Sequence, residues 1–412
     1  MVPVSLPPSS PRIEFHPGDV IAPKGFWADG LNAGLRDQSL DMALLVSQES
    51  ATFSGMFTTN AVRAAPVELS RAVHQQGLCR AVIINSKNAN ALTGALGTQD
   101  AQAMQAQVAR ELGLDVGDVA VASTGVIGWP LPMDRVRAGI FQLAARFREG
   151  DAGDGGAAAQ AILTTDTATK TAACTVALSG GAVTIGMMAK GSGMIHPQMA
   201  TMLAFFTTDA VIAKGALDAC LHTAVERSFH RVSVDGDQST NDMALMWANG
   251  ASCVAVETAD DMALFARGLT ELAVHGARLI AADGEGANHL LSVCVSGASS
   301  EADAAQKARA IVRSALVKTA VYGGDPNWGR VLAAAGTVGV AFVPERVSLF
   351  MNEFPLYLHG EPVVGQDALW SASMDRPEIE FRLDLAQGRE VAYAYGCDLT
   401  DGYVEINAHY RT

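Results

Sequence analysis

The sequence predicts an α+β protein built in layers, and three observations support this prediction. Strand-like runs and helical patterns are mixed along the 412 residues, without the regular strand-helix alternation that produces a parallel sheet. After about residue 346 the chain consists mostly of segments in which apolar and polar residues alternate, as in half-buried strands. Apolar residues make up 49% and charged residues 17% of the chain, which is typical of a compact globular protein with two or three cores.

Strands dominate the expected structure of the first half of the chain. A helix is expected from Asp100 to about Leu112, ended by Gly113, and another opens at 130–136. The glycine-rich stretch 149–160 has the composition of a linker. Strands are predicted at 42–49, 51–60, 81–85, 119–128 (where a strand runs into a glycine turn), 172–178 and 182–188.

The first twelve residues, rich in Pro and Ser, are interpreted as a flexible tail.

The second half combines long helices with alternating strands. Helices are predicted at about 215–229, 259–281 and 301–318. Strands are predicted from just after residue 201 to about 208, and at 231–234, 290–297, 347–351, 378–385, 390–399 and 403–410.

One stretch, KGSGMIHPQMATMLAFF at 190–206, has the features of a self-cleaving segment. If the peptide bond between Ala200 and Thr201 breaks, Thr201 gains a free α-amino group, whose ordinary pKa is about 7.7 to 8.0. Such an amine can take the proton of the threonine hydroxyl as its oxygen attacks a carbonyl. The flexible Gly191 and Gly193 leave space for the strained turn that cleavage needs. The alternative is that Thr201 only opens a buried apolar strand.

Charge and cysteine usage exclude several classes of protein. The formal net charge of -14, without a Lys/Arg-rich stripe, argues against binding to nucleic acid or to an anionic membrane surface. The six cysteines form no CxxC pair, so reduced thiols in the cytoplasm are expected, with neither a disulfide framework nor a zinc site. DGDQSTND at 235–242 starts like a calcium loop but lacks its glycine and distal glutamate, and no metal site is predicted.

Nine segments, in order along the chain, together resemble the ornithine acetyltransferase family, the bifunctional acyltransferases of arginine biosynthesis that cleave themselves into α and β chains. The resemblance covers the whole chain after the tail. The segments are FTTNAVRAAPV (57–67), NANALTG (88–94), STGVIGWPLPMDRV (123–136), AILTTDT (161–167), KGSGMIHPQMATML (190–203), VDGDQSTND (234–242), DGEGA (283–287), LVKTAVYGGDPNWGR (316–330) and YGCDLTDGYVEINAHYRT (395–412).

The resemblance implies a fold and an assembly. The fold is a layered α/β sandwich with a smaller C-terminal α+β domain from about residue 290. Residues 13–200 would form the α chain and residues 201–412 the β chain, and two chains of each kind would associate into a heterotetramer.

The resemblance also implies roles for particular residues. Thr201 is the expected nucleophile, and the bond between Ala200 and Thr201 is the expected cleavage site. The hydroxyl of Thr124 and the backbone N–H of Gly125 are the expected oxyanion hole, the donors that stabilise the negative charge of the tetrahedral intermediate. The substrate contacts implied are Thr164, Lys190, Thr201, Glu285, Asn407 and Thr412. Taken one at a time, these residues have ordinary explanations: a turn at a strand end, a solvated loop charge, a strand-edge hydroxyl or a chain end.

The implied activity is a ping-pong transfer of acetyl from N2-acetylornithine to glutamate through acetyl-Thr201. No cofactor is expected, although some relatives accept acetyl-CoA as a co-substrate. Alternatives are an N-terminal-nucleophile aminopeptidase or amidase, in which water is the acceptor, and a non-catalytic sensor of acylated amino acids. A further alternative is a secondary-metabolism relative with another acyl donor or acceptor, because Lys87 stands where the family usually has a glycine.

Overall fold

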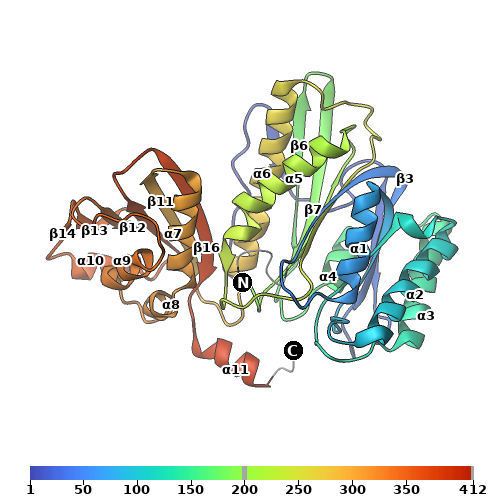
Figure 1. The fold of residues 1–412 in the computed structure, drawn as a ribbon, viewed down its shortest axis with the longest axis horizontal. Helices are drawn as coiled ribbons and strands as arrows, with labels where there is room; N and C mark the ends of the chain where they lie inside the picture. Colours follow the sequence, from blue (N-terminus) through green and yellow to red (C-terminus); the bar gives the residue numbers. More distant parts are fainter. Residues whose placement is uncertain (197–201, 410–412) are drawn as a thin grey trace.

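The computed structural model describes residues 1–196 and 202–409, and these residues form two β-sheets with helices packed against them (Figure 1). In this part of the chain the larger sheet has nine strands, in the order β1-β6-β7-β8-β10-β3-β4-β5, with β2 paired to β3. The expected α+β layering is confirmed. The strands are β1 (Ile13–His16), β2 (Phe26–Leu31), β3 (Met42–Phe57), β4 (Leu78–Asn85), β5 (Val119–Ser123), β6 (Lys170–Leu178), β7 (Gly181–Lys190), β8 (Leu203–Thr208) and β10 (Met243–Ala248).

The smaller sheet has seven strands within the described ranges, in the order β14-β13-β12-β15-β11-β16-β9. It lies beside the larger sheet, and the helices between β11 and β16 pack against it (Figure 1). Its strands are β9 (Val232–Ser233), β11 (Leu290–Ala298), β12 (Ser348–Met351), β13 (Phe354–Leu358), β14 (Glu361–Pro362), β15 (Glu378–Asp384) and β16 (Glu390–Cys397).

Helices cover the larger sheet with apolar faces. The pair α5 and α6 packs on the strands around β6, β7 and β8, whereas α2 and α3 pack on β2 to β5. The helices of this part are α1 (Ala65–Gln76), α2 (Gly94–Leu112), α3 (Met133–Arg148), α4 (Gly155–Ala161), α5 (Lys214–Arg227) and α6 (Ala259–Ala282). Those that follow are α7 (Glu301–Arg313), α8 (Ala315–Tyr322), α9 (Trp328–Gly336), α10 (Asp367–Ser373) and α11 (Asp401–His409).

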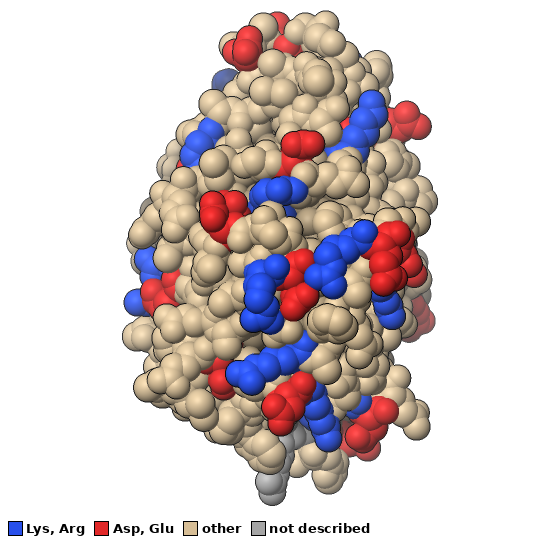
Figure 2. Space-filling view, turned by 90° about the vertical axis from the view of Figure 1, so that its right-hand side faces the viewer, with Lys and Arg blue, Asp and Glu red and all other residues tan. Residues whose placement is uncertain are grey.

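The outer side of the larger sheet, where α2 and α3 lie, carries charges of both signs. Figure 2 shows basic and acidic side chains interspersed over this side. Arg148 on α3, for example, donates to Glu111 on α2 at 2.8 Å. No helix of the described residues is both long and apolar enough to cross a lipid bilayer.

Strand β8 lies in the middle of the larger sheet and begins two residues after Thr201. It pairs with β7 in antiparallel and with β10 in parallel orientation. Ala204 and Phe206 belong to the core on the side of α5 and α6, and Leu203 and Phe205 to the core on the opposite face. Burial on both faces explains why this strand is a continuous apolar run.

Strands of the smaller sheet alternate instead. In β15 Ile379, Phe381 and Leu383 are buried in the core that includes α7, while the intervening residues are partly or fully exposed. The alternation at 378–385 predicted this strand because only one face of the sheet is covered at that point.

Several elements differ from the prediction. The strands expected at 42–49 and 51–60 are one strand, β3, whose register against β4 shifts between Val46 and Ala51. The polar residues SQES at 47–50, which include the single residue left between the two expected strands, are part of the continuous strand at this irregularity. Helix α2 begins at Gly94, six residues before Asp100, and still ends before Gly113, which has a φ of 66°.

Two further differences have local causes. The helix expected at 301–318 is broken at Ser314, which ends α7 and caps α8 by accepting from the N–H of Val317. The linker-like stretch 149–160 contains the start of α4, where Asp154 accepts from the N–H of Ala157 at 2.9 Å.

The two ends of the chain also differ from expectation. In the segment interpreted as a flexible tail, Val2 is 5% exposed and its N–H donates to the carbonyl of Ala282 on α6 at 3.1 Å. The strand predicted at 403–410 is the helix α11 as far as His409. Its alternating residues do not mark a buried face, since none of the helix's residues is buried and Val404 is 64% exposed.

Candidate active site

A cavity of about 190 Å³ collects residues that directly follow β5, β7 and α6, together with α11. Among the predicted site residues, Thr124, Gly125, Thr164, Glu285 and Asn407 line it. They come from segments far apart in the sequence, so the fold brings them together. The lining is completed by Ala89, Ile127, Thr165, Gly193, Met194, Asp235, Asp237, Ser239, Thr240, Asn241 and Tyr403.

Three predicted residues lie outside the described residues: Ala200, Thr201 and Thr412. The described chain resumes at Met202, whose N–H donates to the buried Asp242 Oδ1 at 3.0 Å. The residue after the predicted nucleophile is thus anchored to the loop before β10.

The backbone at Gly125 has a conformation and an approach that only glycine permits. Its φ is 127°, and a Cβ at this position would lie 2.3 Å from the carbonyl carbon of Lys87. The N–H groups of Thr124 and Val126 donate to the carbonyls of Asn85 and Lys87. The N–H of Gly125 makes no hydrogen bond to any described residue, and the residue lines the cavity. A free donor here can serve a ligand oxygen.

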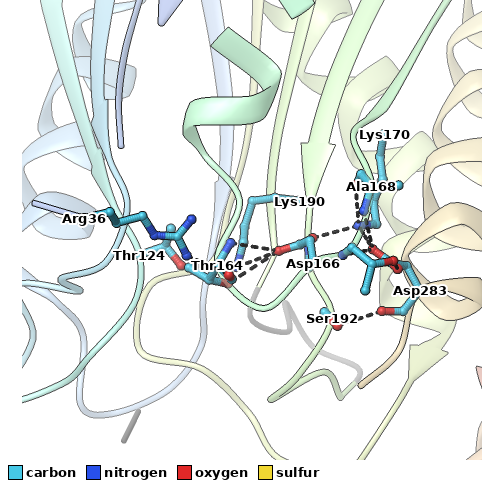
Figure 3. A network of polar contacts seen from close by, with 11 residues as sticks. Arg36, Thr124, Thr164, Asp166, Ala168, Lys170, Lys190, Ser192 and Asp283 are labelled. Atoms are coloured by element: carbon cyan, nitrogen blue, oxygen red, sulfur yellow. Dashed lines mark hydrogen bonds and ion pairs between the residues drawn. The ribbon is translucent and has the colours of Figure 1, made fainter. Parts of the chain in front are cut away.

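Lys190 stands at the end of β7 and reaches Thr124. Its Nζ lies 3.3 Å from Thr124 Oγ1 and 4.0 Å from Asp166 Oδ2, and its side chain is almost fully buried (Figure 3). Burial lowers the pKa of Lys190, an effect that the Asp166 carboxylate opposes and the Lys170 cation reinforces.

Behind Lys190 the buried charges alternate in sign (Figure 3). Lys170 Nζ lies 2.7 Å from Asp166 Oδ1 and 2.6 Å from Asp283 Oδ2, and all three side chains are buried. Burial alone would raise the pKa of Asp166, but the Lys170 and Lys190 cations lower it below its ordinary value. We call Asp166, Lys170 and Asp283 the paired cluster.

The paired cluster holds the backbone of the segments that border the cavity. Asp166 accepts from the N–H of Gly191 at 2.6 Å and from that of Thr164 at 3.0 Å. The carbonyl of Asp283 accepts from Ser192 Oγ at 2.6 Å. The charge-assisted hydrogen bonds to Asp166, together with the neutral bond to the Asp283 carbonyl, fix Thr164 and the glycine-rich turn after Lys190 in place.

Glu285 and Asn407 meet across the cavity. Asn407 Nδ2 donates to Glu285 Oε2 at 2.7 Å and to the carbonyl of Tyr403, one turn earlier in α11. Glu285 is 5% exposed, and its N–H donates to the carbonyl of Ser192. A Cβ at Gly193 would lie 2.3 Å from the Glu285 carboxylate, so this glycine makes room for it. The C-terminal segment thus reaches the site as a helix and not as the expected strand.

The loop 235–242, part of one of the family motifs, supplies several lining residues of the cavity. Asp235 accepts from the N–H groups of Met194 and Ile195 at 2.6 and 2.9 Å, and burial raises its pKa to about 6. Burial also raises the pKa of Asp242 well above its ordinary value, with Lys190 opposing the shift. Asp242 Oδ2 is buried without a hydrogen-bond partner among the described residues. The motif DGDQSTND marked this loop in the sequence, but nothing in the motif distinguished Asp242 from its neighbours.

This geometry defines the class of protein. A small cavity presents a backbone donor without a described partner, a hydroxyl and a carboxylate, and the buried cation Lys190 lies behind its wall at Thr124, which is typical of an enzyme site for a small charged substrate. Within residues 1–196 and 202–409, no group of three or more His, Cys, Asp or Glu residues is placed to hold a metal ion.

Comparison with known proteins identifies the family. The model of the ArgJ family matches residues 27–412. The arginine biosynthesis bifunctional protein ArgJ of Symbiobacterium thermophilum is 47% identical over 406 residues, which cover 97% of this chain and 100% of the relative. The protein of the same name from Parasynechococcus marenigrum is 46% identical over 417 residues and covers 100% of both chains. A crystal structure of ArgJ from Bacillus halodurans, 37% identical, covers 50% of this chain and 97% of its own, with a TM-score of 0.48. The chain belongs to the ArgJ family, as its motifs predicted.

Proposed function

We propose that this protein is a glutamate N-acetyltransferase that takes acetyl from N2-acetylornithine and passes it to glutamate through an ester on Thr201. One observation carries the proposal: the N–H of Gly125, which has no hydrogen-bond partner among the described residues, and the hydroxyl of Thr124 belong to residues that line the same small cavity as Glu285 and Asn407. Two donors for a developing oxyanion therefore lie beside groups suited to the charged ends of an amino acid. Membership of the ArgJ family supports the choice of substrates.

A preparatory cleavage generates the nucleophile. Thr201 Oγ attacks the carbonyl carbon of Ala200, and the amide nitrogen leaves with a proton, so that an ester replaces the peptide bond. Water then hydrolyses the ester to the Ala200 carboxylate and restores the Thr201 hydroxyl. The new α-amino group is the base for the next reaction. The bond from Met202 to Asp242 holds the following residue while this occurs.

The transfer then uses the same oxygen twice. Thr201 Oγ attacks the acetyl carbonyl of N2-acetylornithine while the α-amino group takes its proton, and this proton leaves on the amine of ornithine. Acetyl-Thr201 remains. The amine of glutamate attacks this ester, transfers a proton back to the threonine oxygen and leaves as N-acetylglutamate. At both stages the carbonyl oxygen becomes negative, and Thr124 and Gly125 are the donors proposed to stabilise it.

Charge complementarity assigns the remaining residues. Lys190 is the cation within reach of the oxyanion donors and suits a substrate carboxylate. Glu285 suits an ammonium, and Asn407 orients its carboxylate. Thr164 lines the cavity, and Thr412 completes the proposed set of ligand contacts.

The proposed chemistry needs no metal and no cofactor, since nucleophile, base and oxyanion donors are all protein groups. Acetyl-CoA could act as a second donor because the ester intermediate is the same. We also propose a cytoplasmic enzyme in which two α chains and two β chains form a heterotetramer.

The first test is the intact mass of the purified protein under denaturing conditions, with N-terminal sequencing of any fragments. Two fragments, one beginning at Thr201, are expected. The Thr201→Ala variant provides the matched control and should remain one chain, because it lacks the attacking oxygen. A wild-type protein that stays uncut under conditions of activity would refute the mechanism.

The second test is product analysis with N2-acetylornithine and glutamate. Equal amounts of ornithine and N-acetylglutamate are expected, together with a mass increase of one acetyl group on the Thr201 fragment when glutamate is omitted. Release of free acetate in place of N-acetylglutamate would favour an amidase. Binding of the substrate without turnover or acetylation would favour a sensor.

A further inference from the structure

A second cavity, of about 590 Å³, lies between α7, the end of α9 and two loops of the larger sheet. Its basic lining residues are His196, Arg309 and Arg313. The rest of the lining is Gln238, Gln306, Ala310, Ser314, Ala334, Thr337 and Val338. None of the residues predicted from the sequence to bind substrate belongs to it.

Arg309 and Arg313 have no partner among the described residues. Arg309 and Arg313 are four residues apart on α7, which places them on the same face of the helix. Neither makes a hydrogen bond or an ion pair with any residue that the structure describes. The nearby Arg231 differs, since its Nη2 donates to Glu301 Oε1 at 2.7 Å. Two like charges on one helix face repel each other unless an anion lies between them.

Positive charge predominates around this cavity, because Arg309 and Arg313 line it and Arg231 lies near Arg309. Burial, together with the Arg313 and Arg309 cations, lowers the pKa of His196 to about 4, while Asp237 opposes the shift. Burial and the Arg231 cation lower the pKa of Arg309. The acid near Arg309 is Glu226, which already accepts from His230 Nδ1 at 2.8 Å.

The second cavity is next to the active site along two segments. Met194 lines the first cavity, and His196, two residues later, lines the second. In the loop before β10, Asp237 and Ser239 line the first cavity, and Gln238, between them, lines the second. A ligand in the second cavity would therefore border the segment that leads to the cleavage site.

We propose that Arg309 and Arg313 form a binding site for a phosphate-bearing anion, separate from the cavity that receives the amino-acid substrates. Guanidinium groups bind phosphate oxygens through pairs of parallel hydrogen bonds, and two unpaired guanidinium groups on one face suit a diphosphate. The diphosphate of coenzyme A and a free inorganic anion share this chemistry. The site itself is inferred independently of the acyl transfer; only its use by an acyl donor rests on the proposed function.

Calorimetric titration of the full-length protein tests the site, with inorganic diphosphate and coenzyme A as separate probes. The Arg309→Gln/Arg313→Gln variant should bind diphosphate about a hundredfold more weakly than the wild type, about tenfold for each guanidinium group removed. The Arg309→Lys variant, which keeps the charge but not the planar fork, should fall between them. Arg227→Gln is the matched control, because Arg227 is paired with Glu301 and does not line the cavity. Its binding should be unchanged.

The two probes distinguish the source of the phosphate. Tighter binding of coenzyme A than of diphosphate, with a raised KM for acetyl-CoA and an unchanged KM for N2-acetylornithine in the double variant, would identify a donor subsite. Equal binding of both probes would identify a site for a free anion. Failure of the wild type to bind either probe, or equal binding by the wild type and the double variant, would overturn the proposal. Calorimetric titration of the Thr201→Ala variant, which lacks the proposed nucleophile, should give the same affinity for diphosphate as the wild type. Binding at this site can therefore be judged even if the proposed acyl transfer fails.

Discussion

Two groups of charges flank the segment from Lys190 to His196, and they differ in how their charge is balanced. On one side, Lys170 is buried between Asp166 and Asp283. On the other side, the Arg309 and Arg313 side chains face a cavity without a described partner. The first arrangement is complete within the protein and holds backbone in place. The second has no counter-charge among the described residues and is the proposed anion site. The same residue classes are thus neutralised in one place and left without described partners in the other.

The largest expected effect comes from breaking the paired cluster. Lys170→Met leaves two buried carboxylates without their cation, and should lower the free energy of unfolding by about 3 to 5 kcal/mol. Thermal or urea denaturation measures this. Lys24→Met, at an exposed lysine, is the control and should change little. Adding Asp166→Asn and Asp283→Asn to Lys170→Met should recover part of the loss, and no recovery would show that charge is not the cause.

The next largest effect concerns Thr124, whose hydroxyl accepts from Lys190 Nζ. Thr124→Val removes the proposed oxyanion donor at nearly constant volume, and should reduce kcat by about 10² to 10³ with little change in stability. Thr124→Ser keeps the hydroxyl and should retain most of the activity. Steady-state kinetics on the cleaved protein measure both variants. An equal loss for valine and serine would remove the hydroxyl from the mechanism.

Asp242 sharpens the comparison because it is buried like the paired cluster, whereas its Oδ2, like the two guanidinium groups, has no hydrogen-bond partner among the described residues. Its pKa is raised in the folded protein, so its contribution to stability is present below the ordinary pKa of an aspartate and is lost as the pH rises. Asp242→Asn, which keeps an oxygen for the N–H of Met202, should therefore gain stability relative to the wild type between pH 4 and pH 7.

Denaturation curves over that pH range measure the difference between the two proteins. Asp209→Asn is the matched control. Asp209 directly follows β8, is buried, and accepts from an N–H group at each of its two carboxylate oxygens. This variant should be less stable than the wild type. A difference for Asp242→Asn that stays constant with pH would contradict a raised pKa.

The smallest expected effect is that of Arg309 on stability. Because its guanidinium has no described partner, Arg309→Gln should change the free energy of unfolding by no more than about 0.5 kcal/mol. Denaturation without added anions measures it, and addition of diphosphate should stabilise the wild type more than the variant. A loss comparable to that of Lys170→Met would show that Arg309 supports the fold.

The sequence predicted those elements whose patterns are local. The apolar run after Thr201 gave β8 because both its faces are buried, and the alternation at 378–385 gave β15 because one face is exposed. Gly113 ends α2 as expected, since its positive φ is a local requirement. The alternation at 403–410 failed because α11 buries no face, and hydrophobic pattern carries little information in such a segment.

The site was predictable only as far as the motifs reach. They identified Thr124, Gly125, Thr164, Glu285 and Asn407, which line one cavity. Residue types alone could not show that Lys170 is buried between two carboxylates, one of which is 113 positions away. Nor could they show that Asp242 anchors Met202 or that α7 faces the loop 235–242. Contacts of this kind depend on how distant segments pack.

The order of strands in the larger sheet has one more consequence. β8 and β10 lie between β7 on one side and β3 on the other, so segments from both sides of the proposed cut alternate within one sheet. A cut after Ala200 would divide the covalent chain and leave the hydrogen-bonded ladders whole, so the two pieces could part only by unfolding. Once unfolded, the pieces would have to find each other again in dilute solution, and regaining the native state would become a second-order process. The lifetime of such a molecule is set by its rate of unfolding, because the separated pieces cannot refold as a single chain.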